Sequence, residues 1–171
     1  PTASTTAQLA LGDALAIATM QKKKFSKMDF KKLHPEGSLG AQLKTVEDIM
    51  VTGKKIPFVN ENILTKKALK ILSEKKLGIL IIRDKRNKTI GIITDGQIRR
   101  SSQKKQDFLL LPVKKIMTKK PFGIDKNELA AKALSIMNNK KITSLLVINK
   151  KNPSITIGVI HMHTILESNI S

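Results

Sequence analysis

The amino-acid sequence contains one pattern twice, and this constrains the fold more than any other feature. The pattern opens on Val46-Glu-Asp-Ile-Met50 and again on Val113-Lys-Lys-Ile-Met117, and it closes on Gly91-Ile-Ile-Thr-Asp95 and again on Gly158-Val-Ile-His-Met162. The two openings, like the two closing glycines, are 67 positions apart. A repeat of this size is one supersecondary unit that is too small to bury its apolar face alone. We therefore predict that the two copies pack on each other. We expect the function to lie in the groove between them or in a part attached to them.

Apolar periodicity predicts the same order of elements in both copies: helix, buried strand, turn, strand and helix. In the first copy these elements are expected at 63–75, 77–82, 84–88, 89–94 and 96–103. In the second copy they are expected at 128–138, 142–148, 150–153, 155–160 and 162–168. The polar segment 101–111 is predicted to be a disordered connector.

The segment before the repeats is predicted to contain two helices and no strand. Leu9, Leu11 and Leu15 recur at roughly helical spacing after capping hydroxyls, so we expect a helix over 3–24. Ser26 and Asp29 have the spacing of a capping box, which predicts a second, smaller helix. Two helices are too little to close a core. We therefore expect the uncovered leucines to promote self-association into a homo-oligomer.

The net charge of +19 at pH 7 raises the possibility of nucleic-acid binding. The kind of basic residue argues against it, because only four of the 32 basic residues are arginine, the residue that base-edge recognition favours. The chain also has no Trp or Tyr on which single-stranded bases could stack. We expect no specific nucleic-acid partner, only non-specific adhesion to polyanions at low salt.

The absence of cysteine excludes a disulfide framework and a thiolate metal site, and it favours a reducing compartment. No apolar run approaches the roughly 18–20 residues that span a membrane. The first residues lack the basic and apolar regions of a signal peptide. We therefore expect a cytoplasmic protein with no membrane partner. Since no methionine starts the sequence, we also expect a fragment or a processed product.

The repeats resemble a tandem pair of cystathionine-beta-synthase (CBS) domains. The resemblance is carried by the Asp-Ile-Met and Lys-Ile-Met openings, each followed within two residues by threonine, and by the Gly-Ile-Ile-Thr-Asp turn at 91–95. It implies an α/β fold of small mixed sheets packed with helices.

The whole chain is similar to the arabinose 5-phosphate isomerase family, whose members carry a sugar-isomerase (SIS) domain followed by a CBS pair. Segments 1–5, 11–16, 34–40 and 161–163 carry this similarity. It implies the C-terminal helices of a truncated SIS domain at 1–42, a first CBS domain at 46–104 and a second at 113–171. The implied reaction interconverts ribulose 5-phosphate and arabinose 5-phosphate, for synthesis of the lipopolysaccharide sugar Kdo.

Aldose–ketose isomerisation needs a base, an acid or base at the oxygens and a phosphate cradle. In the family these parts lie mostly upstream of the residue that matches Pro1. His34 is the one catalytic candidate here, since it matches the histidine of the family motif His-Pro-Gly-Gly-Ala-Leu-Gly, with Glu36 and Ser38 departing from that motif. Without the resemblance, a histidine before proline is more often a helix-ending surface residue. We expect no isomerase activity from this chain alone, and sugar-phosphate binding only when the SIS region is supplied.

Many CBS pairs bind adenosine nucleotides between their repeats through an aspartate that accepts both ribose hydroxyls. That aspartate follows the threonine of the turn by three residues, a position held here by Gln97 after Thr94 and by Thr164 in the second copy. Losing such a charge-assisted bond costs about 1.5–3 kcal/mol. The candidate cleft residues are Thr94, Asp95, Gln97 and Thr164, and the expected effector is a weakly bound nucleotide or sugar nucleotide.

His161 and His163 alternate as two metal ligands on one strand would. Because the chain has one further histidine and no cysteine, a turn without metal is favoured.

Three functions are therefore weighed. In the first, the chain is part of an isomerase whose catalysis needs the SIS region. In the second, it is a free-standing CBS pair that regulates a partner or dimerises. In the third, it is the relic of a split gene.

Overall fold

A computed structural model describes residues 2–33, 38–104, 107–168 and 170. The chain divides into two compact units, Pro1–Leu43 and Lys44–Ser171, which are considered separately. Among the described residues, no helix is both long enough and apolar enough to span a membrane.

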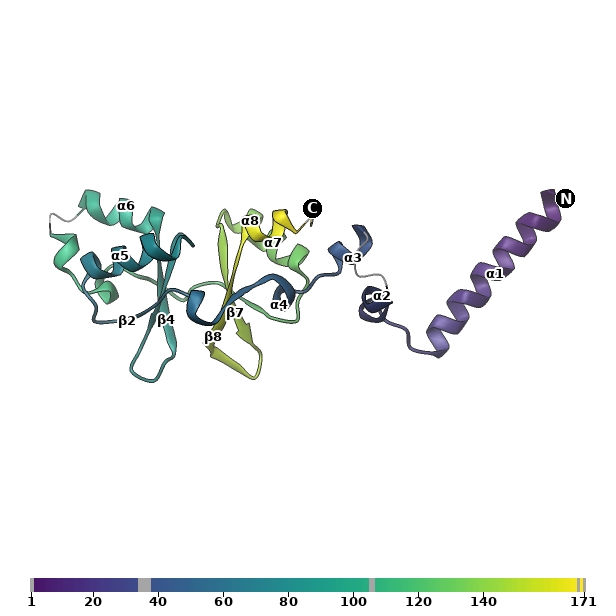
Figure 1. Ribbon diagram of the computed structural model, residues 1–171, viewed down its shortest axis with the longest axis horizontal. Coiled ribbons are helices and arrows are strands. Elements are labelled where there is room, and N and C mark those ends of the chain that lie inside the picture. Colours follow the sequence, from purple (N-terminus) through teal and green to yellow (C-terminus); the bar gives the residue numbers. More distant parts are fainter. Residues whose placement is uncertain (1, 34–37, 105–106, 169, 171) are drawn as a thin grey trace. The chain divides into compact units, whose positions relative to one another are not determined.

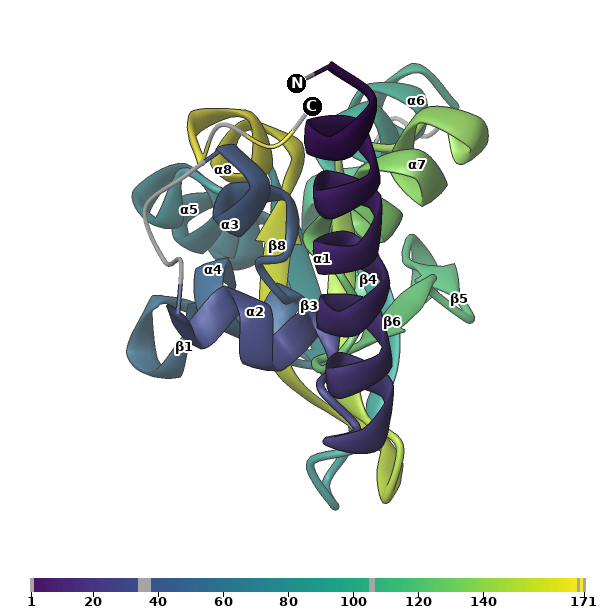
Figure 2. The same cartoon turned by 90° about the vertical axis from the view of Figure 1, so that its right-hand side faces the viewer.

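The described residues of the first unit form three helices, α1 (Thr2–Lys22), α2 (Lys27–Leu33) and α3 (Ser38–Gln42). The two predicted helices are confirmed, and α1 is one uninterrupted helix (Figure 2). The prediction of only two helices was wrong, because residues 38–42 form a further short helix after the proline-containing segment. No residue of α1 is buried, and its three leucines Leu9, Leu11 and Leu15 are 72%, 61% and 60% exposed.

The predicted capping box at the start of α2 is confirmed. The backbone N–H of Ser26 donates to Asp29 Oδ2 at 3.0 Å, and the backbone N–H of Asp29 donates to Ser26 Oγ at 3.2 Å. The Ser26 hydroxyl also donates to the same carboxylate oxygen at 2.7 Å. These bonds to the charged form lower the pKa of Asp29 to about 2.

The second unit contains the two repeats, which lie side by side, each with its two longer helices at one end and its strand-connecting turn at the other (Figure 1). The first repeat comprises α4 (Val46–Ile49), β1 (Val51–Thr52), η1 (Gly53–Lys55), β2 (Phe58–Asn60), α5 (Thr65–Lys75), β3 (Ile79–Arg83), β4 (Thr89–Thr94), α6 (Asp95–Lys104) and η2 (Phe108–Leu110), where η denotes a 3₁₀ turn. The second comprises η3 (Val113–Lys115), β5 (Thr118–Lys119), β6 (Gly123–Asp125), α7 (Ala130–Lys140), β7 (Ser144–Asn149), β8 (Asn152–His161) and α8 (Met162–Glu167). The mixed α/β fold is therefore confirmed.

Each repeat lends its opening strand to the sheet of the other repeat. The two four-stranded sheets have the orders β2-β3-β4-β5 and β1-β8-β7-β6. Within each sheet the first long strand pairs in parallel with a short strand and antiparallel with its hairpin partner, as β3 does with β2 and β4. The remaining strand, β5 or β1, comes from the opening of the other repeat and pairs antiparallel. This exchange joins the two repeats through backbone hydrogen bonds.

The methionine of each opening lies over the closing glycine of the other repeat. A Cβ on Gly91 would stand 2.6 Å from Met117 Sδ, and a Cβ on Gly158 would stand 2.6 Å from Met50 Sδ. Because real Cβ atoms essentially never approach so closely, a side chain at either position would force the methionine to shift, so packing rather than backbone conformation favours both glycines. The repeated methionine and the repeated glycine are thus two halves of one contact.

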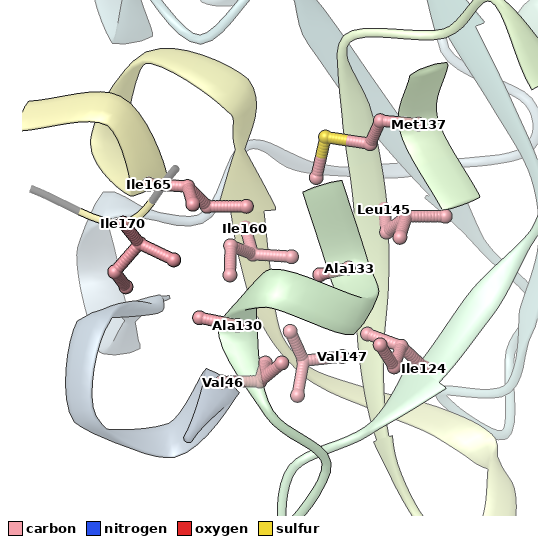
Figure 3. Close-up of a cluster of buried hydrophobic side chains, with 10 residues drawn as sticks. All are labelled: Val46, Ile124, Ala130, Ala133, Met137, Leu145, Val147, Ile160, Ile165 and Ile170. Atoms are coloured by element: carbon pink, nitrogen blue, oxygen red, sulfur yellow. The ribbon is translucent and has the colours of Figure 1, made fainter. Parts of the chain in front are cut away.

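The hydrophobic cores are exchanged in the same way. Val46, from the first opening, is fully buried in the core of the second repeat, where it lies beside Ala130 and Val147 (Figure 3). Val113, from the second opening, is fully buried in the core of the first repeat. A third cluster joins the sheets of both repeats and consists of Ile56, Ile79, Ile81, Leu146 and Val159. Each copy therefore completes the core of the other, as the repeat predicts.

The spacing between equivalent residues changes inside the repeat. The openings and the closing glycines are 67 positions apart, but α5 begins at Thr65 and α7 at Ala130, 65 positions later. The loop before β2 is longer than the loop before β6, and the β7–β8 hairpin is longer than the β3–β4 hairpin. The predicted turn at 150–153 was therefore too long, because β8 already starts at Asn152.

The prediction of a disordered connector at 101–111 was wrong for its described residues. Residues up to Lys104 complete α6, and Ser101 is buried. Phe108–Leu110 form the turn η2, after which Leu111 accepts a hydrogen bond from the Thr65 hydroxyl at 2.7 Å. The polar composition of the segment suggested disorder, but the apolar residues at its end, 108–111, pack against α5.

Candidate ligand-binding cleft

A cleft of about 460 Å³ lies between the two repeats. The first repeat contributes the start of β3, the end of β4 and the first two turns of α6, and the second contributes the end of α7, the start of β7 and the loop after β5. Its lining residues are Gly78, Ile79, Ile92, Thr94, Asp95, Gly96, Arg100, Thr118, Lys120, Pro121, Phe122, Lys141, Ile142, Thr143, Ser144, Leu146 and His161. The volume suits a ligand of nucleotide size.

The floor and one wall of the cleft are apolar. Ile79 and Leu146 belong to the cluster that joins the two sheets, and Ile92 packs against that cluster. Phe122, which is 51% exposed, adds an aromatic face at the rim. Such surfaces can bury the planar or apolar part of a ligand.

The rim of the cleft carries more positive than negative charge. The cations Arg100, Lys120 and Lys141 line it, together with a single carboxylate, that of Asp95. All four side chains belong to exposed residues, so their charges act through partly solvated surroundings. This charge balance favours an anionic group on the ligand.

Gly78 has a conformation that brings the backbone close to Asp95. Its φ is +61°, which is in the left-handed region, and a Cβ there would stand 3.1 Å from Asp95 Oδ2. The carboxylate of Asp95 therefore lies beside the start of β3, at the edge of the cleft.

The predicted cleft residues divide into two groups. Thr94, at the end of β4, and Asp95, at the start of α6, both line the cleft. Gln97 and Thr164 are not among the lining residues; Thr164 is half-buried in α8, and its carbonyl accepts a hydrogen bond from the Ser168 hydroxyl. The catalytic candidate His34 lies outside the described residues.

Gln97 joins α6 to the opening of the second repeat. Its Nε2 donates to the carbonyl of Ile116 at 2.9 Å, and its Oε1 accepts from Thr118 Oγ1 at 3.2 Å and from Arg100 Nη2 at 3.0 Å. The side-chain amide is thus engaged at both ends. Of its partners, Thr118 and Arg100 line the cleft.

His161 occupies in the second repeat the position that Thr94 occupies in the first. It caps α8, because its Nδ1 accepts the backbone N–H of His163 at 3.2 Å, and the two rings stack with centroids 5.1 Å apart. Burial, and to a smaller extent the charge of His163, lower the pKa of His161. Among the described residues no three His, Cys, Asp or Glu side chains gather as a metal site would require.

Exchanging the roles of the two repeats defines a second position equivalent to the cleft, and different side chains fill that position. Ile56 corresponds to Pro121 of the cleft, and it is buried in the cluster that joins the two sheets. A smaller hollow of about 270 Å³ remains there, lined by Val51, Lys55, Glu74, Lys75 and Leu77.

Sequence reasoning did not single out Arg100, Lys120, Lys141 or Phe122. It treated the lysines as dispersed surface charge. No local pattern distinguishes these residues, because only the fold brings their side chains to the cleft.

The family model for the CBS domain matches residues 46–104 and 113–170. The chain belongs to the CBS domain family. The exchange of opening strands between the repeats is therefore the architecture of one CBS pair, and the cleft lies between its two domains.

Curated relatives extend the similarity to the whole chain. The arabinose 5-phosphate isomerase KdsD of Salmonella typhi is 39% identical over 171 residues, which are 99% of this chain and 51% of that protein. The enzyme of the same name from Francisella tularensis is 40% identical over 168 residues, 98% of this chain and 50% of that protein. An uncharacterised protein of Rickettsia prowazekii is 36% identical over 171 residues, 100% of this chain and 52% of that protein. The chain spans about half the length of the curated relatives it matches.

Solved CBS pairs have the same fold. CBSX2 in complex with AMP matches with a TM-score of 0.63 and 20% identity, over 72% of this chain and 94% of that one. The CBS domain pair of protein MJ0100, in complex with 5′-methylthioadenosine and S-adenosyl-L-methionine, matches with a TM-score of 0.63 and 22% identity, over 73% and 94%. At these identities the similarity establishes the fold alone.

Proposed function

We propose that this chain is the C-terminal, CBS-containing part of an arabinose 5-phosphate isomerase-like protein, and that its cleft binds a nucleotide or sugar nucleotide that regulates the enzyme. The observation that carries the proposal is the cleft itself, with an apolar floor, a cationic rim and about 460 Å³ of space between the two repeats. The similarity to isomerases over nearly the whole chain supports the choice of enzyme.

In this proposal residues 1–42 belong to the sugar-isomerase domain and residues 46–104 and 113–171 to the two CBS domains. The first unit supports this division, because it holds three helices with no strand among its described residues and α1 buries none of its residues. The exposed leucines of α1 support self-association, and we propose a cytoplasmic homo-oligomer without a specific nucleic-acid or membrane partner.

We further propose that these 171 residues alone do not interconvert ribulose 5-phosphate and arabinose 5-phosphate. This proposal is supported by length, because the chain spans only about half of the isomerases it matches, and in that family the groups for proton transfer and phosphate binding lie mostly upstream of the residue that matches Pro1. His34 remains a proposed contributor to catalysis in the complete enzyme. Turnover of ribulose 5-phosphate by the purified chain would overturn this part of the proposal.

A second candidate function is a free-standing CBS pair that regulates a partner protein. The exchanged strands and cores favour it, because they make residues 44–171 a self-contained unit with its own cleft. An isomerase assay with the upstream region supplied separates the two candidates: a nucleotide effect on turnover supports the first, and nucleotide binding without any effect on turnover supports the second.

The first experiment is a thermal-shift titration of the purified chain with AMP, ATP, CMP and CMP-Kdo. A ligand that binds only the folded state raises the melting temperature by mass action. We expect a saturable shift with at least one of these compounds. No shift with any of them at millimolar concentration would contradict a regulatory cleft and leave the pair as a structural or relic module.

A further inference from the structure

We propose that His161 is a proton-sensitive switch in the lining of the cleft: the neutral ring caps α8, and protonation releases both the cap and the ring. The switch lies in the second repeat, where β8 passes into α8. It operates without a ligand, so it goes beyond the proposed function and can be tested separately from it.

The cap of α8 requires one ring nitrogen of His161 to be unprotonated. Nδ1 accepts the backbone N–H of His163 at 3.2 Å. Because a ring nitrogen that accepts a hydrogen bond carries no proton, the neutral ring has its proton on Nε2. A second proton would add to Nδ1 and turn this acceptor into a donor. Protonation therefore removes the cap bond and leaves two N–H donors facing each other.

The surroundings of His161 disfavour a charged ring. The ring is half-buried and stacks on His163, with centroids 5.1 Å apart and planes 23° apart. Burial, and to a smaller extent the charge of His163, lower the pKa of His161. The paired strand β7 places the uncharged Ser144 opposite it. The charged residues that line the cleft together with His161 are Asp95, Arg100, Lys120 and Lys141. Most of these are cations, so the charge of the cleft also opposes protonation.

The first repeat has a cap at the same place that cannot titrate. Thr94 is equivalent to His161, and its hydroxyl accepts the backbone N–H of Gln97 in the first turn of α6 at 3.4 Å. A threonine hydroxyl neither gains nor loses a proton at physiological pH. The two repeats thus hold the same helix start by different chemistry, and only the cap of the second repeat depends on pH.

Buried residues on both sides of the cap confine the change to the start of α8. Ile160, before the cap, and Ile165, within α8, are both fully buried in the core of the second repeat (Figure 3). The backbone N–H of Met162 donates to the carbonyl of Thr143, a residue of the cleft lining, at 2.9 Å. Loss of the cap therefore frees the His161 ring without unfolding the repeat. The charged ring then turns from the cleft toward solvent, because burying a charge is costly.

Histidine-ring NMR of the full chain tests the protonation step. At about pH 8 we expect long-range ¹H–¹⁵N spectra to show His161 as the Nε2–H tautomer, with NOEs to the ring of His163. The pKa of His161 should lie below its ordinary value of 6.5, and the NOEs should vanish as the pH falls through that pKa. The Nδ1–H tautomer, a pKa at or above 6.5, or NOEs that persist in the protonated form would overturn the inference.

Solvent-exchange NMR of the backbone amides tests the coupling to α8, and the first repeat provides the matched control. Between about pH 7.5 and about pH 5, the protection of the His163 amide, corrected for its intrinsic exchange rate, should fall about five- to tenfold through loss of the cap bond. The Gln97 amide, which Thr94 caps, should keep its protection within about twofold. A similar fall at both amides, or a fall at neither, would contradict the switch.

Two substitutions separate a switch from a purely structural cap. His161→Thr copies Thr94, so its melting temperature should change less than that of the wild type between about pH 7.5 and about pH 5. The reason is that the contribution of the neutral ring is complete above 6.5 and is lost as the pH falls through the lowered pKa. His163→Ala removes the neighbouring charge but keeps the backbone N–H. The pKa of His161 should therefore rise, and the amide of residue 163 should lose protection at a higher pH. An unchanged pH dependence in both variants would refute the role of His161.

None of these measurements uses a ligand, so their result is independent of the nucleotide titrations. A chain that shows the switch but binds no nucleotide would support this inference and contradict the proposed function. A chain that binds a nucleotide but shows no loss of the cap on protonation would do the reverse.

Discussion

The two repeats share one architecture, but the residues that they place at their common interface differ. The equivalent leucines Leu80 and Leu145 are both fully buried, each in the core of its own repeat. At the interface, by contrast, buried Ile56 corresponds to Pro121 beside the open cleft, and Thr94 corresponds to His161. Core positions are constrained by packing in both copies, whereas interface positions can diverge. This difference is what allows a nearly symmetric pair to carry an asymmetric cleft.

The largest expected effect tests the shared architecture of the two repeats, by asking whether they unfold together. We expect Leu80→Ala and Leu145→Ala each to lower the free energy of unfolding by about 2–5 kcal/mol, because each leaves a cavity in a closed core. Since strands and core residues are exchanged, urea unfolding followed by circular dichroism should show residues 44–171 melting in one transition in both variants. Two transitions, with only one shifted by each substitution, would show that the repeats fold independently.

A smaller effect is expected at the two closing glycines, and it should differ between them. Gly91→Ala and Gly158→Ala each force a methionine to move, at a cost of about 1–3 kcal/mol. The Cβ on Gly91 would also stand 2.9 Å from the carbonyl oxygen of Thr118, compared with 3.1 Å from Val51 at Gly158. Gly91→Ala should therefore have the lower melting temperature of the two.

Gly123→Ala is the control for that comparison. A Cβ on Gly123 would meet its nearest neighbours at 3.6 Å, an ordinary contact distance. Its melting temperature should stay close to that of the wild type. A loss at Gly123 as large as that at Gly91 would mean that the methionine contacts do not explain the glycines.

The two repeats also meet through a pair of equivalent threonines, and a double-mutant cycle measures that contact. Thr89 Oγ1 and Thr156 Oγ1 lie 2.8 Å apart, and Thr156 is buried. We expect Thr156→Val to cost about 1–3 kcal/mol, because it leaves the other hydroxyl without this bond. The double variant with Thr89→Val should cost less than the sum of the single changes. Strict additivity, measured by urea unfolding, would show that this bond does not couple the repeats.

The smallest expected difference concerns acid stability. Asp125, in the second repeat, accepts the backbone N–H groups of Asn127 and Lys150, and the bond from Asn127 is the largest cause of its lowered pKa. The equivalent Asn60 makes the same turn with Asn62 and does not titrate. Because the pKa of Asp125 is lower in the folded state, its contribution is complete above the ordinary value of 3.8 and is lost as the pH falls through the lowered pKa.

The melting temperature of Asp125→Asn should therefore decrease less steeply below pH 4 than that of the wild type. The other carboxylates account for the decrease that remains. Melting curves of the wild type and the variant between pH 2 and pH 7, at about 0.1 M salt, measure the difference. A curve for Asp125→Asn that falls as steeply as that of the wild type would assign the acid sensitivity to other groups.

Several local features could be predicted because they depend on neighbouring residues. The strand Thr89–Thr94 was predicted from the apolar pattern of the repeat, and the capping box of Ser26 and Asp29 was predicted from side-chain spacing. The short strands β1, β2, β5 and β6 were not anticipated. Two or three residues have no periodicity to detect, and their pairing partners lie far along the chain.

The candidate site was predicted only in part, for a related reason. Thr94 and Asp95 follow from the turn motif, and both line the cleft. The same motif does not reveal that the Gln97 side chain turns toward Ile116, because that contact joins residues 19 positions apart. The distribution of lysines gave no indication that Lys120 would face the cleft.

The sequence alone determined that two equivalent units exist, because a repeated apolar pattern can satisfy its burial only by pairing with its copy. The sequence also excluded disulfides and thiolate metal sites, and its repeated motifs identified the resemblance to CBS domains. Only the tertiary structure decided that each opening strand belongs to the other repeat's sheet and that the open side of the interface carries Arg100, Lys120 and Lys141. Local sequence sets the conformation of a segment, whereas the partner of an exchanged strand and the charges around a cleft depend on contacts between distant residues.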